Sequence, residues 1–159
     1  MCLSCNCSSC EHGRDSISVR IAINKLLSYR DHMIGGSYVV HPEKANDIDV
    51  IVHEYKHDIF MEGRLGTEGF RKLRSGDEKY DEIDHVRITD IYEGTIVGIG
   101  KVNVIVVGAI FWAAYVGAIA SMRAEPSKYT ERDARVELHR RLAREVAAIA
   151  KVELPEGAY

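Results

Sequence analysis

Two aspartates two positions apart, Asp47 and Asp49, are the residues of this chain best suited to chemistry. They lie in an otherwise apolar segment that favours a strand. Side chains alternate between the two faces of a strand, so both carboxylates point the same way. Two neighbouring carboxylates repel each other unless a positive charge lies between them, and oxygen ligands favour magnesium or manganese. The sequence therefore predicts a Mg²⁺ (or Mn²⁺) site held by Asp47 and Asp49.

A glycine–serine turn lies just before this strand. Gly36 and Ser37 belong to a tight turn that is followed by a polar loop, and Lys44 lies in that loop. Successive backbone N–H groups in such a turn form a concave binding site for an anion. A metal beside an anion-binding turn is typical of nucleoside triphosphate chemistry. Gly36, Ser37 and Lys44 are therefore candidate nucleotide-binding residues.

The elements that must position these residues are both helices and strands. Apolar residues with helical spacing predict helices at 16–29, 60–73, 109–122 and 130–149. Alternating or β-branched runs predict strands at 32–34, 48–52, 85–92, 95–99 and 101–107. Glu93 and Gly94 are expected to form a bulge or turn, and the last strands are expected to pair as an antiparallel hairpin.

Length and composition limit the classes of protein to which the chain can belong. A chain of 159 residues fits one domain, which we expect at 15–150, with a tail at 1–14 and a loose tail at 151–159. A net charge of -3 excludes a global basic field that would attract nucleic acid. The first residues lack the pattern of a secretory signal, which predicts a cytoplasmic protein. Residues 102–122 carry no charge, but Gly108 divides them into an expected strand and helix, so no membrane contact is expected.

All four cysteines fall within the first ten residues, at Cys2, Cys5, Cys7 and Cys10. Clustered thiols in a chain without a secretory signal favour metal binding over disulfides, and four thiolates can complete a tetrahedral Zn²⁺ site. A single residue separates the two C-x2-C pairs, whereas structural zinc sites usually place a longer loop between them. A reduced tail without metal and an iron–sulfur site are the alternatives.

The spacing of the turn and the two aspartates resembles that of a known family. Gly36-Ser37, nine further residues and then Asp47-Ile48-Asp49 resemble the glycine–serine turn and D-x-D strand of the DNA polymerase beta-like nucleotidyltransferase superfamily. The resemblance implies an α+β fold with a mixed, mostly antiparallel sheet and flanking helices. It also implies two magnesium ions on Asp47 and Asp49, and a serine turn that contacts the β- and γ-phosphates.

The same resemblance implies a third carboxylate on a later, neighbouring strand. The strand at 101–107 matches this position best, and it places Asn103 where the family has an acid. Asparagine offers a carbonyl oxygen to a metal but carries no charge and cannot act as a base. Asp90, on the preceding strand, and Asp84 are the alternatives for a third acid.

The expected function is transfer of a nucleoside monophosphate from a nucleoside triphosphate to an acceptor, with Asp47, Asp49 and Asn103 as the catalytic positions. Asn103 motivates the alternative, a degenerate fold that binds a nucleotide, a nucleic acid or a protein without turnover. The acceptor is left open among small molecules, nucleic acids and proteins. A chain this short has little room for an acceptor-recognition domain, which favours a small or partner-presented acceptor, or a homodimer.

Overall fold

The computed structural model describes residues 16–56, 58–75 and 88–154. The cysteine cluster and Asp84 lie outside the described residues, as do 155–159 of the expected C-terminal tail. The helices are α1 (Ser16–Leu26), α2 (Ile59–Thr67), α3 (Ala109–Ala124) and α4 (Arg132–Ala150), with short 3-10 segments η1 (Gly36–Val39), η2 (Glu54–Lys56) and η4 (Pro126–Tyr129). The strands are β1 (Met33–Gly35), β2 (Asp47–His53), β3 (Arg71–Ser75), β4 (Ile88–Ile96) and β5 (Gly100–Val107).

The described strands form one mixed sheet in the order β1-β2-β5-β4-β3. Three neighbouring pairs are antiparallel, β1 with β2, β5 with β4, and β4 with β3, whereas β2 and β5 are parallel. The predicted β4–β5 hairpin is therefore confirmed. The protein has an α+β fold with a mostly antiparallel sheet flanked by helices, as expected from the sequence.

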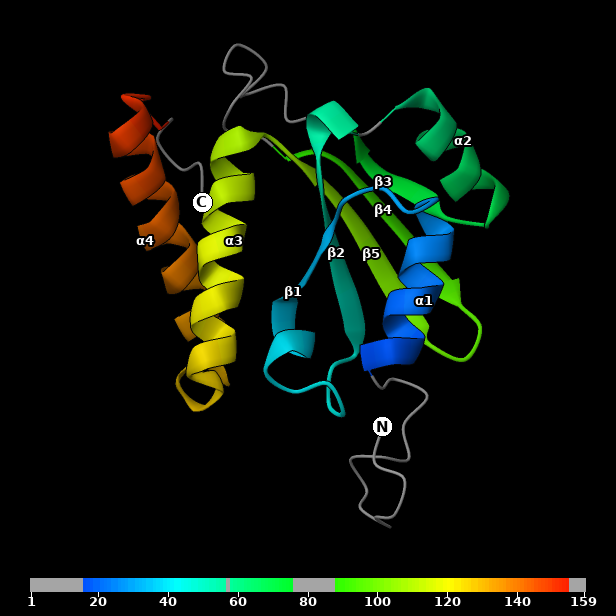
Figure 1. Cartoon of the computed structure of the whole chain (residues 1–159), viewed down its shortest axis with the longest axis horizontal. Helices are drawn as coiled ribbons and strands as arrows, with labels where there is room; N and C mark the ends of the chain where they lie inside the picture. The colour runs from blue at the N-terminus through cyan, green and yellow to red at the C-terminus, as the bar shows by residue number, and fades with distance from the viewer. Residues whose placement is uncertain (1–15, 57, 76–87, 155–159) are drawn as a thin grey trace.

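Helices cover the two faces of the sheet (Figure 1). On one face, α1 and α2 enclose a core that includes the fully buried Ile48, Val50 and Val52 of β2. On the other face, α3 and α4 pack side by side, and Phe111 of α3 joins a core with Ile51 of β2. Asp47 and Asp49 share the side-chain parity of Ile51, so their carboxylates lie on the α3 and α4 face.

Three expected elements differ from the observed ones. The separate strand expected at 95–99 does not form, because β4 continues to Ile96 and residues 97–99 make the turn into β5. The predicted helix at 60–73 ends as α2 at Thr67, because Gly69 turns with a φ of +83° and β3 follows. The expected turn at Glu93-Gly94 is instead the middle of the continuous strand β4. Gly94 suits a strand here because the ring of Phe70 lies where a Cβ would be, 2.6 Å from the ideal position.

The uncharged stretch 102–122 has the predicted division. It comprises most of β5, Gly108 as the N-cap of α3, and most of α3 itself. Among the residues described by the structure, no helix is both long and apolar enough to cross a membrane. After α4, the chain turns at Lys151, which has a φ of +56°, and Leu154 then packs against the α3–α4 side of the core.

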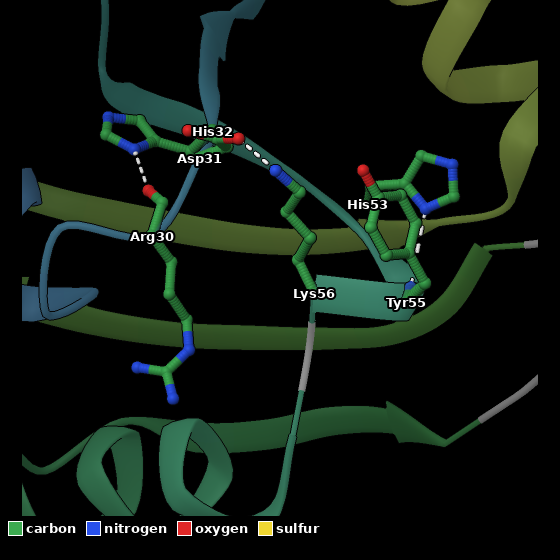
Figure 2. A network of polar contacts seen from close by, with 6 residues as sticks. All are labelled: Arg30, Asp31, His32, His53, Tyr55 and Lys56. Carbon is green, nitrogen blue, oxygen red and sulfur yellow. Dashed lines mark hydrogen bonds and ion pairs between the residues drawn. The ribbon is translucent and has the colours of Figure 1, made fainter.

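A polar network ties the start of β1 to the end of β2 (Figure 2). Asp31, just before β1, forms an ion pair with Lys56, just after β2. The Nδ1 atom of His32 lies 2.9 Å from the carbonyl oxygen of Arg30, and Arg30 pairs with Asp58 at 2.7 Å. Exposed ion pairs contribute little energy each. Their position nevertheless supports the β1–β2 pairing that brings the glycine turn to the aspartates.

Candidate carboxylate site on the sheet

One row of residues crosses the whole sheet at the level of Asp49. Asp49 of β2 pairs with Gly35 of β1 on one side and with Asn103 of β5 on the other. Asn103 in turn pairs with Glu93 of β4, and Glu93 pairs with Arg71 of β3. Directly paired residues project to the same face of a sheet. The row therefore gathers two acids, an amide and a cation on the face that α3 and α4 partly cover.

Asn103 joins the two carboxylates. Its side-chain Nδ2 donates to Asp47 Oδ2 at 2.9 Å and to Asp49 Oδ1 at 3.0 Å. The two aspartates therefore converge on a single donor. The sequence predicts that both aspartates share one face of the strand, but it does not predict these hydrogen bonds. Hydrogen bonds to an ionised carboxylate are stronger than neutral ones, so the amide offsets part of the repulsion between the acids.

The electrostatics of Asp49 are those of a buried acid beside a second acid. Burial raises the pKa of Asp49 above its ordinary value of 3.8, and the nearby charge of Asp47 raises it further. The hydrogen bond from Asn103 and the charges of Arg135 and Lys101 act in the opposite direction. A bound cation would stabilise the ionised form of this carboxylate, which burial and the second acid disfavour.

The predicted glycine–serine turn lies against Asp49. Gly36 has a φ of +67°, and a Cβ built on it would lie 2.3 Å from Asp49 Oδ2. Only glycine therefore allows this close approach of backbone to carboxylate. Ser37 is the second residue of η1, and its carbonyl oxygen accepts hydrogen bonds from the N–H groups of Val40 and His41. Lys44 is exposed in the following loop, and the structure gives it no contact with either aspartate.

Asp90, the alternative third acid and metal ligand, does not join this site, and that prediction needs correction. It pairs in register with Val106, whose side chain is buried in the α1 and α2 core. Its carboxylate lies 3.6 Å from Lys72 Nζ, and Lys72 also contacts Glu62 of α2. Asp90 thus lies on the opposite face of the sheet. The register of β4, which the sequence leaves open, decides this.

Glu93 is the acid of the site that sequence reasoning missed. It lies beside Asn103 and forms an ion pair with Lys101, whose pKa is raised mainly by Glu93 and in part by Asp47 and Asp49. The hydrogen bond from Lys101 lowers the pKa of the Glu93 carboxyl. Alternation along β4 would have found it, had Gly94 not suggested a turn.

Helices α3 and α4 border the carboxylate site with mostly apolar side chains. The rings of Tyr115 of α3 and His139 of α4 pack at a tilt of 59°, with centroids 4.4 Å apart. Burial raises the pKa of the Tyr115 hydroxyl, with a further contribution from the charge of Asp49, which places the phenol in the field of the site. Burial and the charge of Arg135 lower the pKa of His139 to about 4. His139 is therefore neutral near pH 7.

The oxygen atoms of the site suit a hard divalent cation. Within the described residues, no three histidine, cysteine or acidic side chains are grouped closely enough to hold a metal. Mg²⁺, however, is commonly bound by one or two protein carboxylates together with phosphate oxygens of the substrate. Asp47 and Asp49 match that ligand set, and rotation of the Asn103 amide offers its carbonyl oxygen as another ligand.

No protein-family model, curated protein or solved structure matches this chain. A groove of about 730 Å³ does lie on the molecule, but Lys25, Arg64, Phe70 and Val97 are among its lining residues and Asp47, Asp49 and Asn103 are not. The groove is thus separate from the carboxylate site. The site is defined by converging polar groups instead.

Proposed function

We propose that the face carrying Asp47 and Asp49 binds a nucleoside triphosphate with Mg²⁺ (or Mn²⁺) and transfers its nucleoside monophosphate to an acceptor hydroxyl or phosphate. The observation that carries this proposal is the convergence of both carboxylates on the Asn103 amide, 2.9 and 3.0 Å away, with Gly36 packed against Asp49. Asp47 and Asp49 would hold the metal. When bound, the metal would neutralise phosphate charge and polarise the reacting oxygens.

The chain's own groups suggest how the transfer would proceed. An acceptor oxygen would form a bond with the α-phosphorus while the bond from that phosphorus to the bridging oxygen breaks, and pyrophosphate would leave. For a hydroxyl acceptor, a carboxylate of the site would take up the proton that the acceptor loses. Lys101, on the same face, would attract the negative phosphates.

Glu93 is our candidate for the remaining acid of the reaction. It is next to Asn103 in the row, whereas Asp90 faces the other side of the sheet. We expect Lys101 to exchange Glu93 for a phosphate oxygen when the substrate binds, which would release the Glu93 carboxylate toward the reacting groups. Glu93→Gln should then lower the rate of transfer at least tenfold. Asp90→Asn, on the same strand and also ion-paired, is the matched control and should leave the rate within about twofold.

The direct test is transfer of label from an α-labelled nucleoside triphosphate to a mixture of nucleic-acid, protein and small-molecule acceptors in the presence of Mg²⁺. Asp49→Asn keeps the size of the side chain and removes its charge, so it should abolish transfer, whereas Asp90→Asn should not. Label transfer that persists in Asp49→Asn would contradict the proposal. The same assay identifies the acceptor class.

A second candidate function is nucleotide binding without turnover. The position of Asn103 favours it, because an amide carries no charge and cannot act as a base. Under this alternative, Mg²⁺-dependent triphosphate binding is lost in Asp49→Asn, but no label is transferred by the native protein. If Asn103→Asp then transfers label, the absence of an acid at position 103 is the reason why the native protein binds the nucleotide without turnover.

A further inference from the structure

Helix α4 presents one of its arginines to the carboxylate face. Arg135 lies four positions before His139, and residues at this spacing share one face of a helix. His139 is only 8% exposed and its ring packs against that of Tyr115 of α3, so this face of α4 points inward. Arg135 is half-buried, whereas Arg141 and Arg144 on the same helix are exposed. Arg135 is therefore part of the wall over the site.

Backbone carbonyl groups hold Arg135 in place. Its Nη1 atom donates to the carbonyl oxygens of Tyr129 at 2.9 Å and Thr130 at 2.7 Å. Tyr129 packs in the same apolar cluster as Val39 and Val40, which follow the glycine–serine turn after one intervening residue. The guanidinium is thus fixed at the end of α4 that lies beside the turn.

This arrangement leaves N–H groups of the Arg135 guanidinium available to donate hydrogen bonds to a ligand. A guanidinium has five N–H donors in a rigid fork, and both carbonyl bonds use the same nitrogen. Among the residues that the structure describes, no carboxylate forms an ion pair with Arg135. Its charge nevertheless reaches the site, since it lowers the pKa of Asp49 and of His139. The described cations of the site are therefore Lys101 and Arg71 on the sheet and Arg135 on the helices.

We propose that Arg135 binds the terminal phosphates of the nucleoside triphosphate that is bound at Asp47 and Asp49. This inference rests on the proposed function and adds a determinant of specificity to it. The planar fork of arginine matches two phosphate oxygens, and charged hydrogen bonds of this kind are among the stronger ones in proteins. Arg135 lies beside the turn, on the helix side of the carboxylates. It therefore distinguishes a triphosphate from a monophosphate.

The experiment is calorimetric titration of the full chain with Mg²⁺ and either a non-hydrolysable nucleoside triphosphate or the corresponding monophosphate. Arg135→Gln should weaken triphosphate binding about 10- to 100-fold and monophosphate binding by less than about threefold. Arg144→Gln removes an exposed arginine of the same helix and should change neither affinity. Arg135→Lys keeps the charge but loses the fork, so about 3- to 10-fold weaker triphosphate binding is expected.

The outcomes separate this inference from the proposed function. If the native protein binds the triphosphate and Arg135→Gln binds it equally well, the inference is wrong and the proposed function stands. Equal losses in Arg135→Gln and Arg144→Gln also overturn the inference, because they indicate general attraction by the basic helix. Absence of triphosphate binding by the native protein overturns both. If Arg135→Gln does not fold, an unchanged triphosphate affinity of Arg135→Lys overturns the inference.

Discussion

Replacement of Gly36 by alanine tests whether the turn and the carboxylates form one packed unit. Gly36 has a φ of +67°, in the left-handed region, which costs an alanine about 1–2 kcal/mol. The added Cβ would also lie 2.3 Å from Asp49 Oδ2 and 3.3 Å from Asp49 Cβ. Because Asn103 also holds this short side chain, displacement should cost about 1–3 kcal/mol more. We expect Gly36→Ala to lower the free energy of unfolding by about 2–5 kcal/mol.

Gly69 provides a matched control for this prediction. It also has a positive φ, +83°, but an added Cβ would have no heavy atom within 4 Å. Gly69→Ala should therefore show only the backbone cost of about 1–2 kcal/mol. Urea denaturation of both variants measures the difference. Equal losses of stability in the two variants would refute the close packing of Gly36 on Asp49.

A double-mutant cycle assigns the excess cost to the carboxylate. In an Asp49→Ala background the Oδ2 and Cγ atoms are absent, so Gly36→Ala should lose only about the same stability as Gly69→Ala. We expect a coupling free energy of about 1–3 kcal/mol between positions 36 and 49. A coupling below about 0.5 kcal/mol would mean that the turn and the acid are independent.

Three further predictions concern single residues. The folded-state pKa of His139 lies near 4, below its ordinary 6.5, so its contribution to stability is present above pH 6.5 and is lost as pH falls. In urea denaturation, the native protein should lose up to about 3 kcal/mol of unfolding free energy by pH 4 relative to His139→Phe. Parallel pH profiles of the two proteins would contradict this. Asn103→Asp replaces a hydrogen-bond donor to two carboxylates with a third negative charge. Thermal unfolding in a chelator should therefore show a loss of at least about 2 kcal/mol of unfolding free energy, most of which Mg²⁺ restores. A loss that Mg²⁺ leaves unchanged would count against a metal site. Asp58 caps α2 by accepting a hydrogen bond from the N–H of Met61 at 2.8 Å, so Asp58→Ala should lower the unfolding free energy by about 1 kcal/mol. Thermal denaturation measures this loss, and an unchanged midpoint would show that the cap is not stabilising.

Strand β2 and its neighbour β5 could be predicted because local signals agreed. Alternation in β2 placed Ile48 and Val50 in the core and the aspartates on the opposite face. The β-branched run at 101–107 then identified the strand that carries Asn103. The hydrogen bonds from Asn103 to both aspartates depend on the parallel pairing of β2 and β5. The family resemblance led us to expect that the two strands are neighbours, but their relative direction was not predicted.

Other parts of the site depend on contacts that local patterns do not contain. Gly94 suggested a turn, but it lies within β4 because Phe70, distant in sequence, packs over it. This hid Glu93 as a member of the row. Local sequence patterns do not distinguish Arg135 from the other arginines of α4, because only the packing of α4 on α3 brings it near Asp49. Asp90 was misplaced because a register shift near the start of β4 sets its face.

The most direct test of the central claim is the thermal stability of the native chain with Mg²⁺ and a non-hydrolysable nucleoside triphosphate. At about 100 times the dissociation constant, bound ligand should add about 2.7 kcal/mol of stability. We predict an increase in the unfolding midpoint that requires both Mg²⁺ and the triphosphate, persists in Asp90→Asn and is absent in Asp49→Asn. An increase of the same size without Mg²⁺, or in Asp49→Asn, would contradict a metal–nucleotide site at Asp47 and Asp49, and so would no increase at all.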